Sequence, residues 1–102
     1  MALYSSTREL IGNTPLVKLT HLDLPEGASL YAKLELMNPA GSVKDRIGQY
    51  MLESAERDGR IKPGGTIVEA TAGNTGLGIA FAALNRGYRV IFVVPTDRKS
   101  VV

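Results

Sequence analysis

Residues 66–95 constrain the fold of this chain more than any other segment. TIVEAT (66–71) has the composition of a strand, and GNTGLGIAFAALNR (73–86) that of a helix which glycines open and Gly87 ends. YRVIFVVP (88–95) is almost continuously apolar, which is typical of a strand buried on both faces of a parallel sheet. Strand, loop, helix and strand in this order are the building block of α/β proteins. We therefore expect an α/β fold with an open, mostly parallel sheet and flanking helices.

The first half of the chain predicts two shorter strands and one more helix. Residues 6–11 fit a single helical turn, and GNTP (12–15) is a turn. LVKLT (16–20) and SLYAKLEL (29–36) alternate apolar and other residues, as half-buried strands do. A longer helix is predicted over residues 43–58. The side chains expected on its apolar side are Val43, Ile47, Tyr50, Met51 and Ala55.

Lys44 occupies an unfavourable position in this predicted helix. Ser42 and Asp45 have the spacing of a capping box that opens a helix, which puts Lys44 in the first turn. A cation near the positive end of the helix dipole is disfavoured by about 0.3–1 kcal/mol. One interpretation is a solvated side chain that tolerates this cost. The other is a lysine whose ammonium form is disfavoured, so that the free amine attacks an aldehyde and holds it as a Schiff base.

TAGNTG (71–76) lies where open α/β sheets bind ligands, beyond the carboxyl end of a strand. Its backbone N–H groups, with Thr and Asn side chains, suit a carboxylate or a phosphate. The spacing of Gly73, Gly76 and Gly78 does not match GxGxxG, and no Gly-Lys-Ser/Thr follows, so dinucleotide and Walker motifs are excluded. The alternative is a tight connection that needs glycine only for backbone freedom.

Composition excludes several other classes of function. The net charge is only +2, and the basic residues are scattered, so we expect no nucleic-acid partner. The absence of cysteine excludes disulfides, thiolate metal sites and Cys nucleophiles, and we expect no metal. No apolar stretch approaches the roughly 20 residues of a membrane span. We therefore expect no membrane association and a cytoplasmic location.

Three motifs, IGNTPLVKL (11–19), NPAGSVKDRIG (38–48) and EATAGNTG (69–76), occur in this order. Together they resemble the N-terminal part of the cysteine synthase and cystathionine β-synthase family. These enzymes use pyridoxal 5'-phosphate and share the two-domain fold type of tryptophan synthase β. The resemblance implies that residues 1–96 are the N-terminal portion of such an enzyme, which is usually a homodimer. IGNTPL is interpreted as structural, a turn that fixes the approach of the first strand.

The resemblance also implies roles for individual residues. Lys44 matches the lysine that carries the cofactor and acts as a base in turnover. Asn74 matches the asparagine whose amide binds the 3′-oxygen of the cofactor. The loop that grips the α-carboxylate of the amino-acid substrate matches Thr71, Ala72, Asn74 and Thr75.

The implied reaction is β-replacement on an activated serine such as O-acetylserine, with a sulfur nucleophile, to form cysteine. Ala72 stands where many cysteine synthases have serine, which favours the alternative in which homocysteine adds and cystathionine forms. A serine/threonine dehydratase and a short, non-catalytic anion-binding protein are further alternatives.

The last six residues differ from the family pattern. DRKSVV (97–102) matches the translation of a common short-read sequencing adapter, so we expect the natural sequence to end near Thr96 and residues 97–102 to be a non-native tail. The loop that binds the cofactor phosphate lies farther along in the family. We therefore expect the 102-residue chain to be inactive by itself.

Overall fold

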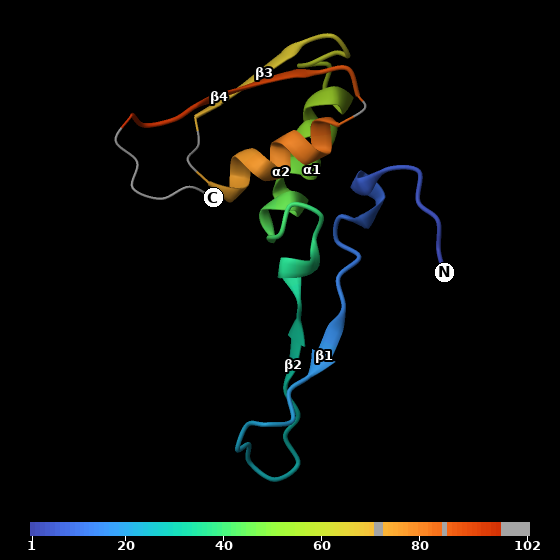
Figure 1. The fold of residues 1–102 in the computed structure, drawn as a ribbon, viewed down its shortest axis with the longest axis vertical. Helices are drawn as coiled ribbons and strands as arrows, with labels where there is room; N and C mark the ends of the chain where they lie inside the picture. The colour runs from blue at the N-terminus through green and yellow to red at the C-terminus, as the bar shows by residue number, and fades with distance from the viewer. Residues whose placement is uncertain (71–72, 85, 97–102) are drawn as a thin grey trace.

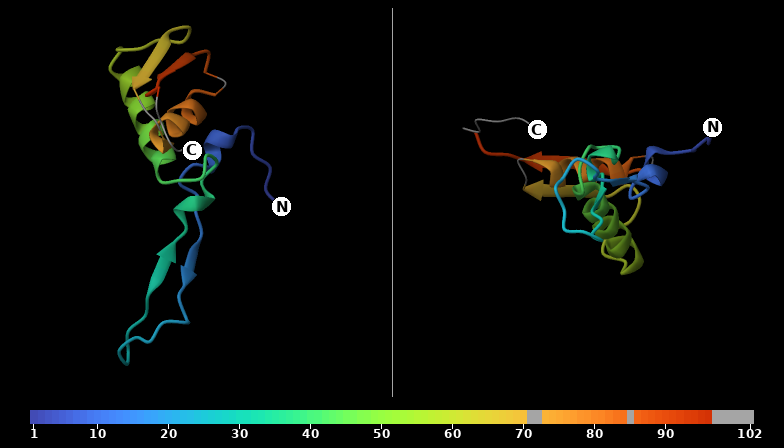
Figure 2. Two further views of the ribbon diagram at one scale, coloured as in Figure 1. Left: turned by 60° about the vertical axis from the view of Figure 1, so that its left-hand side comes forward. Right: turned by 90° about the horizontal axis from the view of Figure 1, so that it is seen from below.

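The computed structural model describes residues 1–70, 73–84 and 86–96, and it forms a body with a projecting arm (Figure 1). The arm is a β-hairpin, and the body contains both long helices and a parallel strand pair; the left view of Figure 2 shows the arm leading away from the body. The elements are η1 (Thr7–Leu10), β1 (Leu16–Lys18), β2 (Tyr31–Lys33), η2 (Glu35–Met37), α1 (Lys44–Arg57), β3 (Thr66–Ala70), α2 (Asn74–Ala83) and β4 (Arg89–Val93).

The strand–helix–strand unit predicted for residues 66–95 is confirmed. Strands β3 and β4 are parallel, in register from Thr66 opposite Arg89 to Ala70 opposite Val93, and α2 connects them. The described residues form two separate two-stranded sheets, of which the hairpin is antiparallel. The α/β class is therefore confirmed for this unit, whereas the expected wider, mostly parallel sheet is not formed within the described residues.

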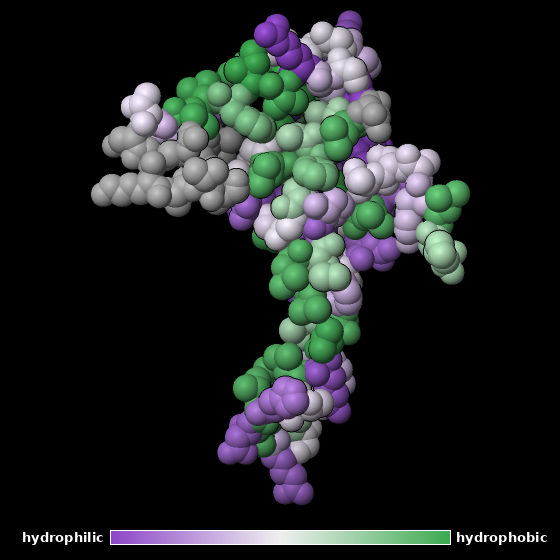
Figure 3. Space-filling view, in the orientation of Figure 1, coloured by the Kyte–Doolittle hydropathy of each residue, from purple (hydrophilic) through white to green (hydrophobic). Residues whose placement is uncertain are grey.

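The burial predicted for the strands is wrong. Leu16 and Tyr31 in the arm are 64% and 52% exposed, because the arm extends away from the body. In β4, Phe92 and Val93 are 39% and 55% exposed, although an apolar strand was expected to be buried on both faces. Figure 3 shows hydrophobic residues at the surface over β3 and β4 and along the arm. The end of the predicted strand 29–36 is the 3-10 helix η2 instead.

Helix α1 begins and ends within one residue of its predicted bounds, but the predicted capping box is absent. Val43 is the N-cap residue, and the Ser42 hydroxyl accepts a hydrogen bond from the Lys44 N–H at 3.1 Å. Asp45 Oδ2 accepts from the Ala40 N–H at 2.7 Å rather than from Ser42. The reason is the tight turn before α1, in which Gly41 has a φ of +96° that favours glycine.

A capping box is present instead at η1, which confirms the helical turn predicted for residues 6–11. The Ser6 hydroxyl accepts from the Arg8 N–H, and the Glu9 carboxylate accepts from the Ser6 N–H. None of the helices within the described ranges has the length and apolar character that crossing a membrane requires.

The hydrophobic core is small and lies where the two helices meet the parallel strands. Leu52 of α1 packs with Ala82 and Ala83 of α2, and Ile67 of β3 and Val90 of β4 pack against this cluster. The predicted apolar side of α1 is wrong, because the buried positions of this helix are Asp45, Gly48 and Leu52. Four of the five side chains expected on the inner side are exposed, namely Val43, Ile47, Tyr50 and Met51.

Candidate active site

The structure brings Lys44 close to the beginning of α2. The backbone of Lys44 lies against Gly78, so closely that a Cβ on this glycine would overlap the Lys44 carbonyl group. Gly78 lies four residues, or about 6 Å of helix, beyond Asn74. Lys44 therefore lies about one helical turn from Asn74 and Thr75, two residues of the predicted carboxylate loop. The other two, Thr71 and Ala72, lie outside the described residues.

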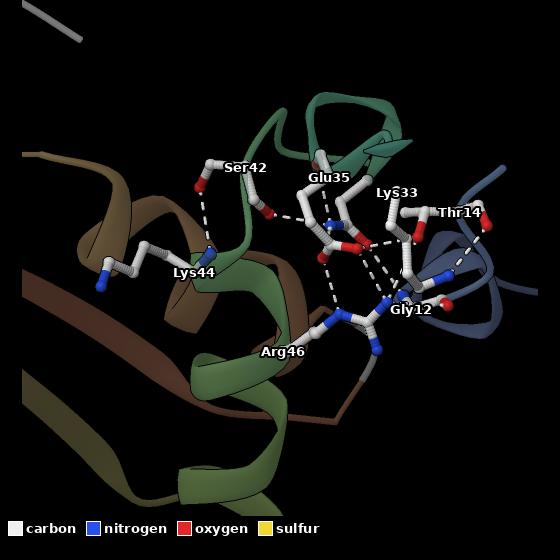
Figure 4. A network of polar contacts seen from close by, with 8 residues as sticks. Gly12, Thr14, Lys33, Glu35, Ser42, Lys44 and Arg46 are labelled. Atoms are coloured by element: carbon white, nitrogen blue, oxygen red, sulfur yellow. Dashed lines mark hydrogen bonds and ion pairs between the residues drawn. The ribbon is translucent and has the colours of Figure 1, made fainter. Parts of the chain in front are cut away.

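The Lys44 side chain leaves the first turn of α1 on the side opposite to Arg46 (Figure 4). Lys44 is half-buried, and its backbone N–H is held by the Ser42 hydroxyl. Within the described part of the chain, no hydrogen bond or ion pair holds its Nζ atom. An amine that is anchored at its backbone and unpartnered at its tip is available to react with an added carbonyl group.

The first turn of α2 presents the backbone N–H groups of Asn74 and Thr75, whereas that of Gly76 donates to the Gly73 carbonyl at 3.2 Å. The first N–H groups of any α-helix lack a partner within the helix, and the dipole favours negative charge there. Gly73 occupies the N-cap position and has no side chain with which to accept hydrogen bonds from these groups. Asn74 is exposed and Thr75 is half-buried. A carboxylate is therefore a chemically suitable ligand for this end of α2.

Arg46 connects α1 to two other segments of the chain, as the dashed lines in Figure 4 show. Its Nε donates to Glu35 Oε1 at 2.6 Å, and its Nη2 donates to Glu35 Oε2 at 3.0 Å. The same Nη2 donates to the Gly12 carbonyl at 3.0 Å and to the Thr14 hydroxyl at 3.2 Å. A bidentate arginine of this kind fixes orientation as well as distance.

Asn38 completes this network from within the NPAGSVKDRIG segment. It is only 4% exposed, and its Oδ1 accepts from the Gly12 N–H at 2.8 Å. Its Nδ2 donates to the backbone carbonyls of Glu35 at 2.9 Å and Ser42 at 3.0 Å. The network formed by Gly12, Thr14, Glu35, Asn38 and Arg46 is called the Arg46 network below. It anchors the turn that leads into Lys44.

The Arg46 network perturbs the acidity of Glu35. The hydrogen bonds from Arg46, and then that from Thr14, lower the pKa of the Glu35 carboxyl from 4.5 to about 2. The Thr14 hydroxyl donates to Glu35 Oε2 at 2.8 Å. The pKa of Arg46 is raised by the same contact with Glu35. Both groups are therefore charged at neutral pH, and the ion pair persists there.

The structural role predicted for IGNTPL is confirmed and extended. Gly12 has a φ of +83° in the turn before β1, and a side chain at this position would meet the Arg46 guanidinium. Sequence reasoning missed Glu35, Asn38 and Arg46, because their partners lie up to 34 residues away along the chain. The sequence offers one hint, an arginine within NPAGSVKDRIG and a glutamate three residues before this motif, but this hint does not show that the two side chains pair.

Comparison with known proteins identifies the family. The family model described as "Pyridoxal-phosphate dependent enzyme" matches residues 7–101. The chain belongs to this family. The resemblance drawn from the three motifs is thereby confirmed.

Proteins with similar sequences include two bacterial enzymes. The chain is 54% identical over 95 residues to an O-acetylserine dependent cystathionine beta-synthase of Bacillus subtilis, covering 93% of this chain and 31% of that protein. It is 54% identical over 87 residues to a cysteine synthase of Staphylococcus aureus, covering 85% of this chain and 28% of that protein. The chain thus spans less than a third of the length of these relatives.

A solved relative shows the same fold over this segment. The crystal structure of cystathionine beta-synthase from Bacillus anthracis superposes with a TM-score of 0.81 at 52% sequence identity. The match covers 97% of this chain and 37% of that chain. The partial coverage agrees with the prediction that these residues are one portion of a longer enzyme.

The described residues fit part of a pyridoxal-phosphate site. The cofactor has an aldehyde, which requires a lysine amine with a free tip, and Lys44 supplies one. Residues that would bind the cofactor phosphate were expected beyond this segment. Lys44 and the first turn of α2 are therefore chemically suited to hold one part of such a cofactor.

Proposed function

We propose that this chain is the lysine-bearing portion of an enzyme that replaces the β-substituent of an activated serine with a sulfur nucleophile, forming cysteine. The observation that carries the proposal is the backbone contact of Lys44 with Gly78, one helical turn from Asn74, together with a Lys44 amine that no described residue holds. The relatives that act on O-acetylserine or form cysteine support it by their sequence similarity.

Lys44 has two roles in this proposal. Its Nζ anchors the cofactor in the resting enzyme and, once released by the substrate, accepts the proton from the substrate Cα. Pyridoxal 5'-phosphate, when bound, supplies a conjugated ring that stabilises negative charge at Cα. Acetate leaves from Cβ, sulfur adds there, and Nζ returns the proton to Cα. The net reaction converts O-acetylserine and hydrogen sulfide into cysteine and acetic acid.

The loop at the start of α2 binds and orients the amino acid in this proposal. The α-carboxylate is bound by Thr71, Ala72, Asn74 and Thr75. The N–H groups of the first turn of α2 are suited to such an anion. The Asn74 amide also hydrogen-bonds the 3′-oxygen of the cofactor. Holding the carboxylate fixes the direction in which the Cα–H bond points, so that Nζ of Lys44 reaches this proton.

A second candidate is the formation of cystathionine from homocysteine. It is favoured by Ala72, and the B. subtilis relative named for this reaction aligns over 95 residues at 54% identity. Both candidates share every step up to the addition of sulfur. They differ only in the nucleophile, so the roles of Lys44 and Asn74 are the same in both.

The test uses the full-length enzyme that carries this segment. It is incubated with O-acetylserine and either sulfide or homocysteine, and the products are identified by mass spectrometry. Cysteine from sulfide supports the proposal, cystathionine alone supports the second candidate, and a ketoacid from serine or threonine would indicate a dehydratase. No reaction with any of these substrates would contradict the enzyme proposal.

Replacing the lysine tests its role directly. We expect Lys44→Ala to lower kcat by about 10²–10⁴-fold, because general-base catalysis contributes that much. The visible absorbance of the lysine-bound cofactor should disappear as well. Lys62→Ala, at an exposed position in the turn before β3, is the matched control and should retain both properties. Retention of absorbance in Lys44→Ala would refute the assignment.

A further inference from the structure

Helices α1 and α2 cross at two glycines, where their backbones touch. Gly48 of α1 and Gly78 of α2 are both buried. A Cβ added to Gly48 would lie 2.5 Å from the carbonyl oxygen of Gly78 and 2.6 Å from the nitrogen of Ile79. Real Cβ atoms essentially never approach other atoms within 3.0 Å. Only glycine at both positions permits this separation of the helix axes.

From the side of α2, Gly78 contacts the backbone of Lys44 itself. A Cβ added to Gly78 would lie 2.7 Å from the Lys44 carbonyl carbon, closer still to its oxygen, and 3.1 Å from the nitrogen of Asp45. These are backbone atoms, so rotation of a side chain cannot relieve the overlap. The first turn of α1 would have to move away from α2 instead.

Each of the two glycines lies about one helical turn from a residue of the proposed site. Gly48 lies four residues after Lys44, and Gly78 lies four residues after Asn74. Residues four apart share a face of a helix. The faces that meet at the crossing are therefore the faces on which Lys44 and Asn74 lie. The separation of the two backbones at this crossing sets the distance between the lysine and the start of α2.

We propose that Gly78 is a positioning residue for Lys44, holding the lysine at a fixed distance from the N-terminus of α2. This inference rests on the proposed function of Lys44. A methyl group at position 78 would displace the first turn of α1 by about 1 Å, and a misplacement of that size can lower a rate by about 10²-fold. Neither glycine touches the reacting atoms, and both act through the backbone.

The experiment compares three variants of the full-length enzyme. Gly78→Ala and Gly48→Ala overfill the crossing, whereas Leu52→Ala removes a core side chain two turns along α1 from Lys44. The stability of each apoenzyme is measured by urea unfolding. Cofactor affinity is measured by titrating the apoenzyme, the lysine-bound cofactor by its visible absorbance, and kcat and KM separately.

We expect Gly78→Ala to lower cofactor affinity by about tenfold or more and kcat by about 10–100-fold, with an altered visible absorbance. Gly48→Ala should show the same changes with smaller amplitude, because its overlap begins one turn farther from Lys44. Leu52→Ala should lower the urea midpoint while its cofactor affinity and absorbance stay within about twofold of the unmodified enzyme. This pattern separates positioning from stability.

Two results would overturn the inference. The first is a Gly78→Ala enzyme that differs from Leu52→Ala only in its stability. The second is failure of both glycine variants to fold when Leu52→Ala does fold, because the crossing would then serve the fold alone. Failure of the proposed function is recognised independently, since the unmodified enzyme would then show no cofactor on Lys44.

Discussion

Lys44 and Asp45 are neighbours in the first turn of α1 but have opposite surroundings. Lys44 is half-buried, and its amine has no partner among the described residues. Asp45 is fully buried, with Oδ2 bonded to the Ala40 N–H and Oδ1 lacking a hydrogen-bond partner. A carboxylate here is favoured by the positive end of the helix dipole. The sequence located both residues, but it paired Asp45 with the wrong backbone group.

Substitution of Asp45 measures how much its hydrogen bond with the Ala40 N–H contributes to stability. We expect Asp45→Ala to destabilise the full-length enzyme by about 1–3 kcal/mol, because the half-buried Ala40 N–H loses its acceptor. Asp45→Asn retains an oxygen that can accept from Ala40, so it should cost less. Urea unfolding of both variants gives the difference. An equal loss in the two variants would show that the charge, rather than the hydrogen bond, is what matters.

At the scale of elements, the sequence pattern predicted which helices and strands form, and where they begin and end, better than it predicted how they pack. The period of apolar residues located α1 to within one residue at each end, because helix formation depends on local sequence. It selected the wrong face, because a hydrophobic pattern gives no weight to Gly48, which is buried through backbone contact with α2. The Arg46 network could not be predicted either, since it depends on the folded path of the chain.

The Arg46 network predicts that the stability of the protein depends on pH through the protonation of Glu35. Its pKa is lowered from 4.5 to about 2, so the folded state binds this proton more weakly than the unfolded state does. The contribution of Glu35 to stability is complete above its ordinary pKa and is lost as the pH falls from 4.5 toward 2. We expect the thermal stability of the full-length enzyme to decrease over this range.

Glu35→Gln isolates the contribution of this carboxylate. The variant should be less stable than the unmodified enzyme at neutral pH, and the difference should shrink as the pH falls from 4.5 toward 2. Glu26→Gln, on the exposed loop of the arm, is the matched control and should leave the pH dependence unchanged. A difference between Glu35→Gln and the unmodified enzyme that is constant with pH would contradict the account.

The molecule as a whole is extended and has little core. Its radius of gyration is 17.2 Å, against about 13 Å for a compact domain of this length. Its accessible surface is 7328 Å², against about 5,600 Å² for a folded monomer of this mass. The sequence contains enough apolar residues for a core, but many of them are exposed on the arm, α1 and β4. Burial of these residues requires contacts with protein outside this chain, which no pattern within this chain describes.

The isolated chain should therefore behave differently from the full-length enzyme. We expect the 102-residue chain to bind a hydrophobic dye and to melt without a cooperative transition, because its core is too small to offset the loss of chain entropy. It should also form no product from O-acetylserine. Differential scanning calorimetry checks this, and a sharp, two-state transition of the isolated chain would show that the body is stable by itself.

The most direct test of the central claim locates the cofactor on the chain. The full-length enzyme, loaded with pyridoxal 5'-phosphate, is reduced with borohydride to make the lysine linkage permanent, digested, and mapped by mass spectrometry. The account predicts the modification on Lys44, in the peptide that contains the beginning of α1. Modification of a different lysine, with Lys44 unmodified, would contradict it.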